Sequence, residues 1–203
     1  MRRVPSCLVL IGLLGAGLAS AAVPALAQVS GPAAQEAAPP AETRQARLDR
    51  LFSELRQERN ERAAARIADA IRADWLRSGS ATVDLLMQRA GSAMQNRKFA
   101  AALDFLDEVT MLAPDFAEGW NRRATLRYMM RDHTRAMADV ERALRLEPRH
   151  FGALAGMAAI LRANGRTQAA LDAYARVLAI YPMLRSAQRE MIELADALAG
   201  QGA

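Results

Sequence analysis

Cysteine is almost absent from this sequence, because Cys7 is the only one in 203 residues. Cys7 precedes an apolar run, so it does not stand where the lipidated cysteine of a lipoprotein signal would stand. The chain after residue 27 therefore has no thiol, which excludes disulfides, thiolate metal sites and thiol catalysis there. We expect that part of the chain to be held together by packing alone.

Aromatic residues are also scarce, at 5% of the chain, whereas hydrophobic residues make up 52%. Chains rich in alanine and poor in aromatics favour close-packed helices over sheets. Lys98 is the only lysine among 27 basic residues, and the arginines alternate with acids, which is typical of solvated helix faces. Setting aside Arg2 and Arg3 lowers the formal charge from +5 by two, to +3. The sequence therefore predicts no binding of nucleic acid.

Residues 1–27 have the order of a secretory signal peptide. A basic start is followed by an apolar run over residues 8–18 and by Ala25-Leu26-Ala27, a small-x-small cleavage site. Cleavage after Ala21 is the second possibility. An uncleaved inner-membrane anchor is the third, although Pro24 and the glycines disfavour it. The segment predicts export to the periplasm, with membrane contact only if the signal peptide is left uncleaved.

The next two segments differ sharply in composition. Residues 28–43 contain two adjacent prolines, many alanines and almost no large apolar residues, which predicts a disordered linker. Residues 44–80 predict two amphipathic helices. Their apolar faces consist of Leu48, Leu51, Phe52 and Leu55 in the first, and of Ile67, Ile71 and Trp75 in the second. We interpret them as a degenerate N-terminal helical hairpin that caps the segment that follows.

Residues 83–184 contain three consecutive 34-residue units, 83–116, 117–150 and 151–184. Small residues and prolines recur at this period: Ala90, Ala124 and Ala158; Ala102, Ala136 and Ala170; Pro114, Pro148 and Pro182. The small residues at equivalent positions of the three units, which we call columns, let the two helices of a hairpin approach to about 8 Å. The proline ends the second helix. Gly165 marks the turn inside the third unit, with Arg97 and Arg131 at the same position. Larger apolar residues, among them Leu112, Leu146 and Ile180, are expected to fill between helices.

These columns resemble the tetratricopeptide repeat (TPR) family. The second unit carries Trp120, Ala124, Ala136, Ala143 and Pro148 in family positions, and the third carries Leu154, Ala158, Gly165, Ala170, Tyr174 and Pro182. The resemblance implies an all-α fold, a right-handed superhelical solenoid of antiparallel helix hairpins with three repeats and flanking cap helices. A final amphipathic helix over residues 185–199 is expected to cover the last hairpin.

The resemblance further implies that the first helices of the hairpins line a concave groove. The candidate partner-binding residues in it are Met87, Gly91, Met94, Asn121, Arg122, Thr125, Tyr128, Met129 and Arg162. Methionines are adaptable apolar contacts. The alternative is that they belong to the core and that another face binds. Gly152, Gly156 and Arg122 replace residues with which some family members clamp a C-terminal carboxylate, so that activity is not carried over.

The sequence offers no catalytic constellation. His133 and His150 are expected to be exposed in loops at opposite ends of a helix, which excludes a metal pair, and we find neither a phosphate-binding loop nor a nucleophile elbow. We predict no cofactor, no metal and no enzymatic activity. The expected function is a non-catalytic scaffold or adaptor that binds a protein or peptide partner in the bacterial periplasm. The alternative is a self-associating structural module of the cell envelope.

Overall fold

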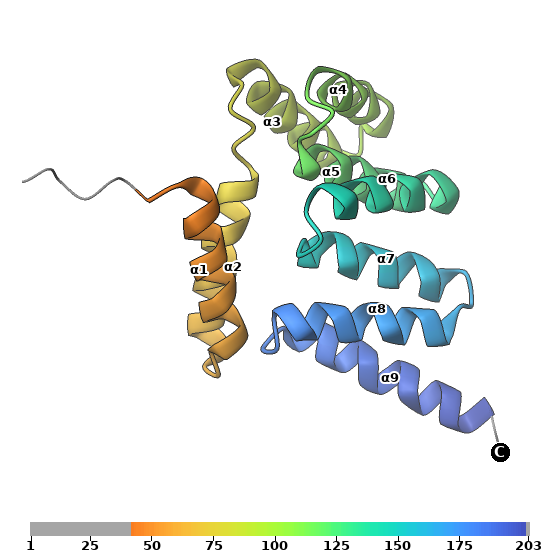
Figure 1. Cartoon of the computed structure of the whole chain (residues 1–203). Coiled ribbons are helices and arrows are strands. Elements are labelled where there is room, and N and C mark those ends of the chain that lie inside the picture. Colours follow the sequence, from red (N-terminus) through yellow and green to blue (C-terminus); the bar gives the residue numbers. More distant parts are fainter. Residues whose placement is uncertain (1–41, 202–203) are drawn as a thin grey trace, which may run out of the picture. The chain divides into compact units, whose positions relative to one another are not determined.

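The computed structural model describes residues 42–201, so the predicted signal peptide and nearly all of the predicted linker lie outside the described residues. The described part contains nine α-helices and no strand (Figure 1). The helices are α1 (Arg44–Gln57), α2 (Glu61–Trp75), α3 (Ala81–Gln95), α4 (Phe99–Leu112), α5 (Ala117–Met129), α6 (His133–Leu146), α7 (Phe151–Ala163), α8 (Thr167–Ile180) and α9 (Arg185–Gln201). The predicted fold class, an all-α solenoid of helix hairpins, is confirmed.

The small-residue columns lie where the helices of the hairpins α3–α4, α5–α6 and α7–α8 meet. Their members are all buried: Ala90, Ala124 and Ala158 on the first helices, and Ala102, Ala136 and Ala170 on the second. An alanine side chain occupies little volume between two helices, so the two backbones can approach closely. A larger side chain at the same position would push the helices apart. Leu112 differs from the expectation for its column, because 50% of its surface is exposed whereas Leu146 and Ile180 are half-buried.

The turns inside the three hairpins share one backbone feature. Arg97, Arg131 and Gly165, at equivalent positions of the three units, have φ angles of 56°, 65° and 72°. This left-handed conformation is easy for glycine and costs roughly 1 kcal/mol or more for other residues. Each turn is tightened by a backbone hydrogen bond that spans it, such as Arg166 N to Leu161 O at 2.9 Å. The turn position expected from Gly165 is therefore used in all three repeats.

The N-terminal hairpin α1–α2 does not stack on the first repeat. Its apolar faces share one core with α7, α8 and α9, whereas α3 and α4 form a separate core. It lies across the ends of the later helices (Figure 1). There Arg149 lies over the ring of Phe52 at 4.2 Å, and Arg185 Nε pairs with Glu61 at 3.1 Å. The hairpin, which we call the strap, therefore covers one edge of the solenoid instead of extending it.

The link between the strap and the first repeat interrupts the repeat pattern, and Trp75 packs elsewhere. Residues 76–80 contain Gly79 with a φ of 85°, and the periodicity of the three units does not extend across this link. Trp75, at the end of α2, instead meets aromatic side chains of the third repeat. Its ring centroid lies 4.9 Å from that of Phe151, which in turn lies 5.7 Å from that of Tyr181. Burial of large aromatic surface makes this the favourable docking place.

The solenoid ends on α9, which packs on α8 through Ala187 and Leu194. The opposite face of α9 is exposed, as Ile192 shows with 62% of its surface accessible. An amphipathic last helix of this kind shields the open side of a terminal hairpin. The outer face of α3, at the other end, carries no such cover in the described part of the chain, and Leu85 there is 47% exposed.

A buried ion pair network fixes α5, the central helix, between its neighbours. Asp139 of α6 accepts hydrogen bonds from Arg123 Nε and Nη2 at 3.0 and 2.9 Å and from Arg127 Nη1 at 2.7 Å. Arg123 Nη1 also donates to Asp107 and Thr110 of α4, both at 2.7 Å. The carboxylate is 3% exposed and the two arginines 12% and 15%. The network therefore ties the first repeat to the second through α5.

Candidate functional site

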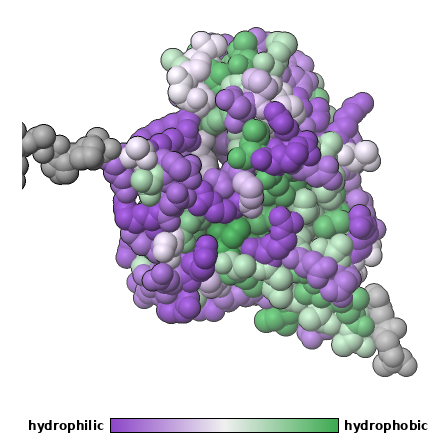
Figure 2. All heavy atoms as spheres, viewed as in Figure 1, coloured by the Kyte–Doolittle hydropathy of each residue, from purple (hydrophilic) through white to green (hydrophobic). Residues whose placement is uncertain are grey.

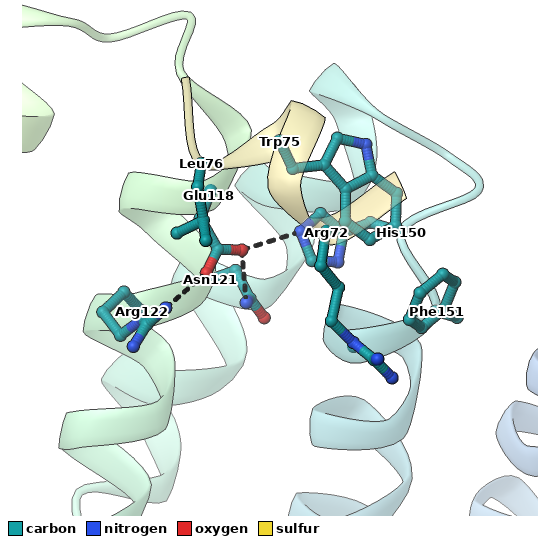
Figure 3. Close-up of a pocket in the computed structure, with 9 residues that line it drawn as sticks. Arg72, Trp75, Leu76, Glu118, Asn121, Arg122, His150 and Phe151 are labelled. Atoms are coloured by element: carbon teal, nitrogen blue, oxygen red, sulfur yellow. Dashed lines mark hydrogen bonds and ion pairs between the residues drawn. The ribbon is translucent and has the colours of Figure 1, made fainter. Parts of the chain in front are cut away.

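The candidate site is a groove between α5 and α7, bounded at one end by the strap. Two cavities lie along it, and Asn121 lines both. The first, which we call the latch pocket, is about 120 Å³ in volume and is shown in Figure 3. The second, which we call the floor pocket, is about 90 Å³. Viewed as in Figure 1, the surface shows apolar residues over α7 and α8 and hydrophilic residues along the strap (Figure 2).

Glu118 organises the polar wall of the latch pocket. Its carboxylate accepts hydrogen bonds from Asn121 Nδ2 at 2.8 Å, from Arg122 Nη2 at 2.9 Å and from His150 Nε2 at 3.0 Å (Figure 3). Burial opposes ionisation of this side chain, but His150, Arg122 and Asn121 together hold the pKa of Glu118 below its usual value. An ionised Glu118 thus fixes the orientation of two groove residues of α5, Asn121 and Arg122.

His150 is buried, so the expectation that it is an exposed loop residue was wrong. Only 2% of its surface is accessible. Its Nδ1 accepts a hydrogen bond from the backbone N–H of Ala153 at 3.1 Å and caps α7. The proton must then be on Nε2, which donates to Glu118. The imidazole also stacks on the indole of Trp75, with ring centroids 4.0 Å apart. A chain of contacts therefore runs from the strap to the groove.

The repeat itself carried a signal for this burial. The residues equivalent to His150 in the first and third units are Phe116 and Leu184, both apolar. Phe116 is buried and stands at the N-cap position of α5, as His150 does at α7, but it makes no side-chain hydrogen bond there. An apolar column at the link between repeats indicates a buried position, and a histidine in that column must then find polar partners. The other histidine, His133, is half-buried at the start of α6, and its Nδ1 lies 2.9 Å from Asn164 Oδ1.

The floor pocket is apolar and owes its depth to a glycine. Ala124, Val140 and Ile160 form its base, and Gly156 leaves space where other residues would place a side chain. A Cβ added to Gly156 would meet only Val140 Cγ2, at 3.8 Å, which is ordinary van der Waals contact. The far end is closed by Tyr128, whose ring stacks on that of His133 with centroids 5.3 Å apart. The groove thus has an apolar centre between two polar ends.

The structure brings together four of the nine predicted groove residues. Asn121 and Arg122 line the latch pocket, and Asn121, Thr125 and Tyr128 line the floor pocket. Gly91 of α3 is half-buried, and a Cβ added there would meet nothing within 4 Å. These positions remain predicted binding residues, now with a defined geometry.

The other predicted residues have different surroundings. Met87 is 8% exposed and belongs to the core of the first repeat, and Met94 packs against that core. Met129 is 46% exposed and lines neither pocket of the groove. Arg162 pairs with Glu190 and, at 3.7 Å, with Glu193, so it connects α7 to α9. The candidate binding residues did not include Trp75, Glu118 or His150, which build the latch pocket.

Residues 42–201 contain no cluster of histidine, cysteine and carboxylate side chains arranged to hold a metal ion. No helix in that range combines the length and the apolar character needed to cross a bilayer. In the latch pocket, Glu118, Asn121, Arg122 and His150 are bonded to one another, which suits a fixed recognition surface.

Known proteins are similar to this chain in sequence and in architecture. No family model matches the chain. A TPR repeat-containing protein of Rhizobium etli is 53% identical over 154 residues, which cover 76% of each chain. Small glutamine-rich tetratricopeptide repeat-containing protein 2 of Saccharomyces cerevisiae is 29% identical over 97 residues. That match spans 48% of this chain but only 28% of the yeast protein.

Solved structures show the same fold at low sequence identity. The first TPR domain of Spaghetti (RPAP3), bound to the HSP90 peptide SRMEEVD, superposes with a TM-score of 0.56 at 21% identity, covering 58% of this chain and 94% of that chain. A crystal structure of MamA superposes with a TM-score of 0.54 at 18% identity, covering 78% and 84%. With the repeated hairpins, the buried alanine columns and the extent of the Rhizobium match, this chain belongs to the tetratricopeptide repeat family.

Proposed function

We propose that this protein is a non-catalytic adaptor that binds a short extended segment of a partner protein in the groove between α5 and α7. TPR domains are in general protein-interaction modules, and two of the similar structures hold HSP90 or Hsp70 peptides. The observation that carries the proposal is the groove itself, with two pockets that share Asn121. An apolar floor supplies affinity, and the polar groups at both ends fix direction.

The dimensions of the groove favour an extended partner. Its α5 wall runs from Glu118 to Tyr128, which corresponds to about 15 Å of helix. That length accommodates roughly four or five residues of extended chain. The centres of the two pockets lie about four residues apart along α5, or about 6 Å, close to the repeat of alternate side chains on a strand. Pockets of about 120 and 90 Å³ each admit one side chain but no helix, whose diameter is about 10–12 Å.

A groove-filling substitution tests this proposal. Gly156→Leu places an apolar side chain in the floor pocket, and glycine is the poorer helix former by about 1 kcal/mol, so the variant should fold at least as stably. Ala138→Leu adds a similar side chain on an exposed position of α6 and serves as the matched control. We expect Gly156→Leu to reduce partner capture from the native host at least tenfold. Equal capture by the two variants would overturn the groove proposal.

The site of action is proposed to be the periplasm. The support is the signal-like order of residues 1–27 and the absence of cysteine after them. Fractionation of the native host, followed by mass spectrometry of the N-terminal peptide, tests this. A periplasmic protein that begins at residue 28 is the expected result. A chain that keeps residues 1–27 in the membrane fraction would support the anchored alternative, and recovery in the cytoplasm would refute export.

Self-association through the first repeat is the second candidate function. Its support is the exposure of Leu85, Met111 and Leu112 at 47%, 69% and 50%. The outer face of α3 is also partly polar, because Ser92 stands where the next repeats have the buried Leu126 and Ile160. A polar serine in place of a buried apolar residue suits a terminal face in contact with water better than it suits a protein interface. Light scattering across a dilution series discriminates the two: a monomer supports the adaptor, and a persistent dimer supports self-association.

A further inference from the structure

A third cavity adjoins the latch pocket, and Trp75 and Glu118 line both. We call it the edge pocket. It is about 330 Å³ in volume, within the range of ligand sites. The strap contributes Leu48 and Trp75, the link before α5 contributes Asp115 and Phe116, and the end of α6 contributes Leu146 and Glu147. Three separate parts of the chain therefore build it.

Apolar side chains line one part of the edge pocket, and polar or charged side chains line the rest. Leu48 and Phe116 are buried and Leu146 is half-buried. Among the carboxylates, Asp115 forms no hydrogen bond or ion pair with any described residue, whereas Glu147 is engaged by Arg149. Arg44, the one cation in the lining, donates to Asp74 through Nε at 3.1 Å and to the Asp74 carbonyl through Nη2 at 2.8 Å. Asp74 is shared with Arg47, so the acidic balance of the pocket comes from its lining, which holds three carboxylates against the one guanidinium.

Trp75 adds an unsatisfied donor. The residue is 6% exposed, and its indole N–H is buried without an acceptor among the described residues. In Figure 3 the indole nitrogen lies on the side of the ring away from Glu118 and Arg122, so it is turned from the latch pocket. This nitrogen is itself out of reach of the pocket, so the indole N–H signal serves as a reporter of changes in the pocket wall.

We propose that the edge pocket binds an arginine residue of a partner protein. The aliphatic part of the side chain packs against Leu48, Phe116 and Leu146, while the guanidinium pairs with Asp115. Arginine fits better than lysine because its guanidinium is more weakly hydrated and loses less on entering a half-enclosed site. The edge pocket shares Trp75 and Glu118 with the latch pocket, but Asp115, Leu48, Phe116 and Leu146 line the edge pocket alone, so its occupancy is tested independently of the groove.

Nuclear magnetic resonance of the ¹⁵N-labelled protein tests this site with small probes. N-acetyl-arginine methylamide carries the stem and the charge, and the citrulline analogue has the same shape without the charge. We expect the Trp75 indole cross-peak to move with the arginine probe, with a Kd on the order of 1 mM. The citrulline probe should bind about tenfold more weakly. The indole N–H of Trp120 already donates to Pro114 O at 3.0 Å, whereas that of Trp75 has no acceptor in the described part of the chain. The two indole cross-peaks should therefore have different chemical shifts.

Asp115→Asn supplies the decisive variant, because Asp115 is exposed in a link and its loss should leave the fold intact. It should abolish the preference for arginine over citrulline. Asp104→Asn, on the exposed face of α4, is the matched control and should keep the preference. Equal affinities for the two probes in the unmodified protein, or an unchanged preference in Asp115→Asn, would overturn the proposal. Neither result bears on the groove, which Gly156→Leu tests separately.

Discussion

Removal of the Asp139 carboxylate is the most informative single perturbation of the scaffold. Asp139→Ala leaves Arg123 and Arg127 buried without their main partner. Breaking a buried pair from one side typically costs about 3–5 kcal/mol. Arg123 keeps Asp107 and Thr110 at 2.7 Å, so we expect a loss near the lower limit, about 3 kcal/mol. For a domain of this size that corresponds to a fall in Tm of about 6–12 °C.

The third repeat provides an internal rescue. At the equivalent positions it has Met157, Leu161 and Ala173, which are apolar and at least half-buried. The triple variant Arg123→Met, Arg127→Leu, Asp139→Ala transplants that arrangement into the second repeat. Replacement of a buried ionic network by packed apolar residues is often neutral or stabilising. We therefore expect the triple variant to unfold within about 2 kcal/mol of the unmodified chain, well above the single variant.

Urea unfolding followed by circular dichroism measures all of these stabilities. Asp104→Ala is the control, because this aspartate is exposed on α4 and surface substitutions usually change stability by less than about 0.5 kcal/mol. A loss below about 1 kcal/mol in Asp139→Ala would contradict a buried, mutually dependent network. So would a triple variant that is no more stable than the single one.

Two further predictions concern the strap and its link to the groove. Trp75→Ala should cost about 3–5 kcal/mol and raise amide exchange in α1 and α2 before α3 to α6, because the strap loses its aromatic anchor. Leu76→Ala, next to it and 45% exposed, should leave exchange in the strap unchanged, and equal exchange in both variants would refute the anchor. The pKa of Glu118 is lower in the folded chain than its usual 4.5, so this carboxylate adds stability at neutral pH that is lost as the pH falls below about 4.5. Glu118→Gln should show a smaller loss of stability between pH 6 and pH 3, measured by urea unfolding, and an identical loss would contradict the role of this carboxylate.

The repeat architecture was predictable because its determinants are local and periodic. A small side chain at Ala90 or Ala102 sets the distance between two adjacent helices, and the same requirement returns in each unit. The proline that ends each second helix acts within one turn of its own position. Such rules need no knowledge of distant contacts, which is why the fold class and the buried columns could be read directly.

The strap and the latch pocket depend on contacts between distant parts of the chain. The apolar face with Ile71 and Trp75 predicts that α2 is buried, but not against which repeat. Trp75 meets His150 although the whole first repeat and most of the second separate them in the sequence. The methionines were ambiguous for a related reason: Met87 fits equally well in a groove or in a core, and only the packing of α3 on α4 decides. Periodicity identifies buried faces, whereas tertiary packing selects their partners.

Site-specific photo-crosslinking in the native host tests the central claim, that the partner lies in the groove between α5 and α7. A benzophenone amino acid is introduced at Thr125, which is exposed at the floor pocket, or at Glu141, which is exposed on α6 outside both pockets of the groove. We predict a discrete partner adduct from Thr125 and none from Glu141. An adduct from Glu141 with none from Thr125 would contradict the account, because it would place the partner outside the groove.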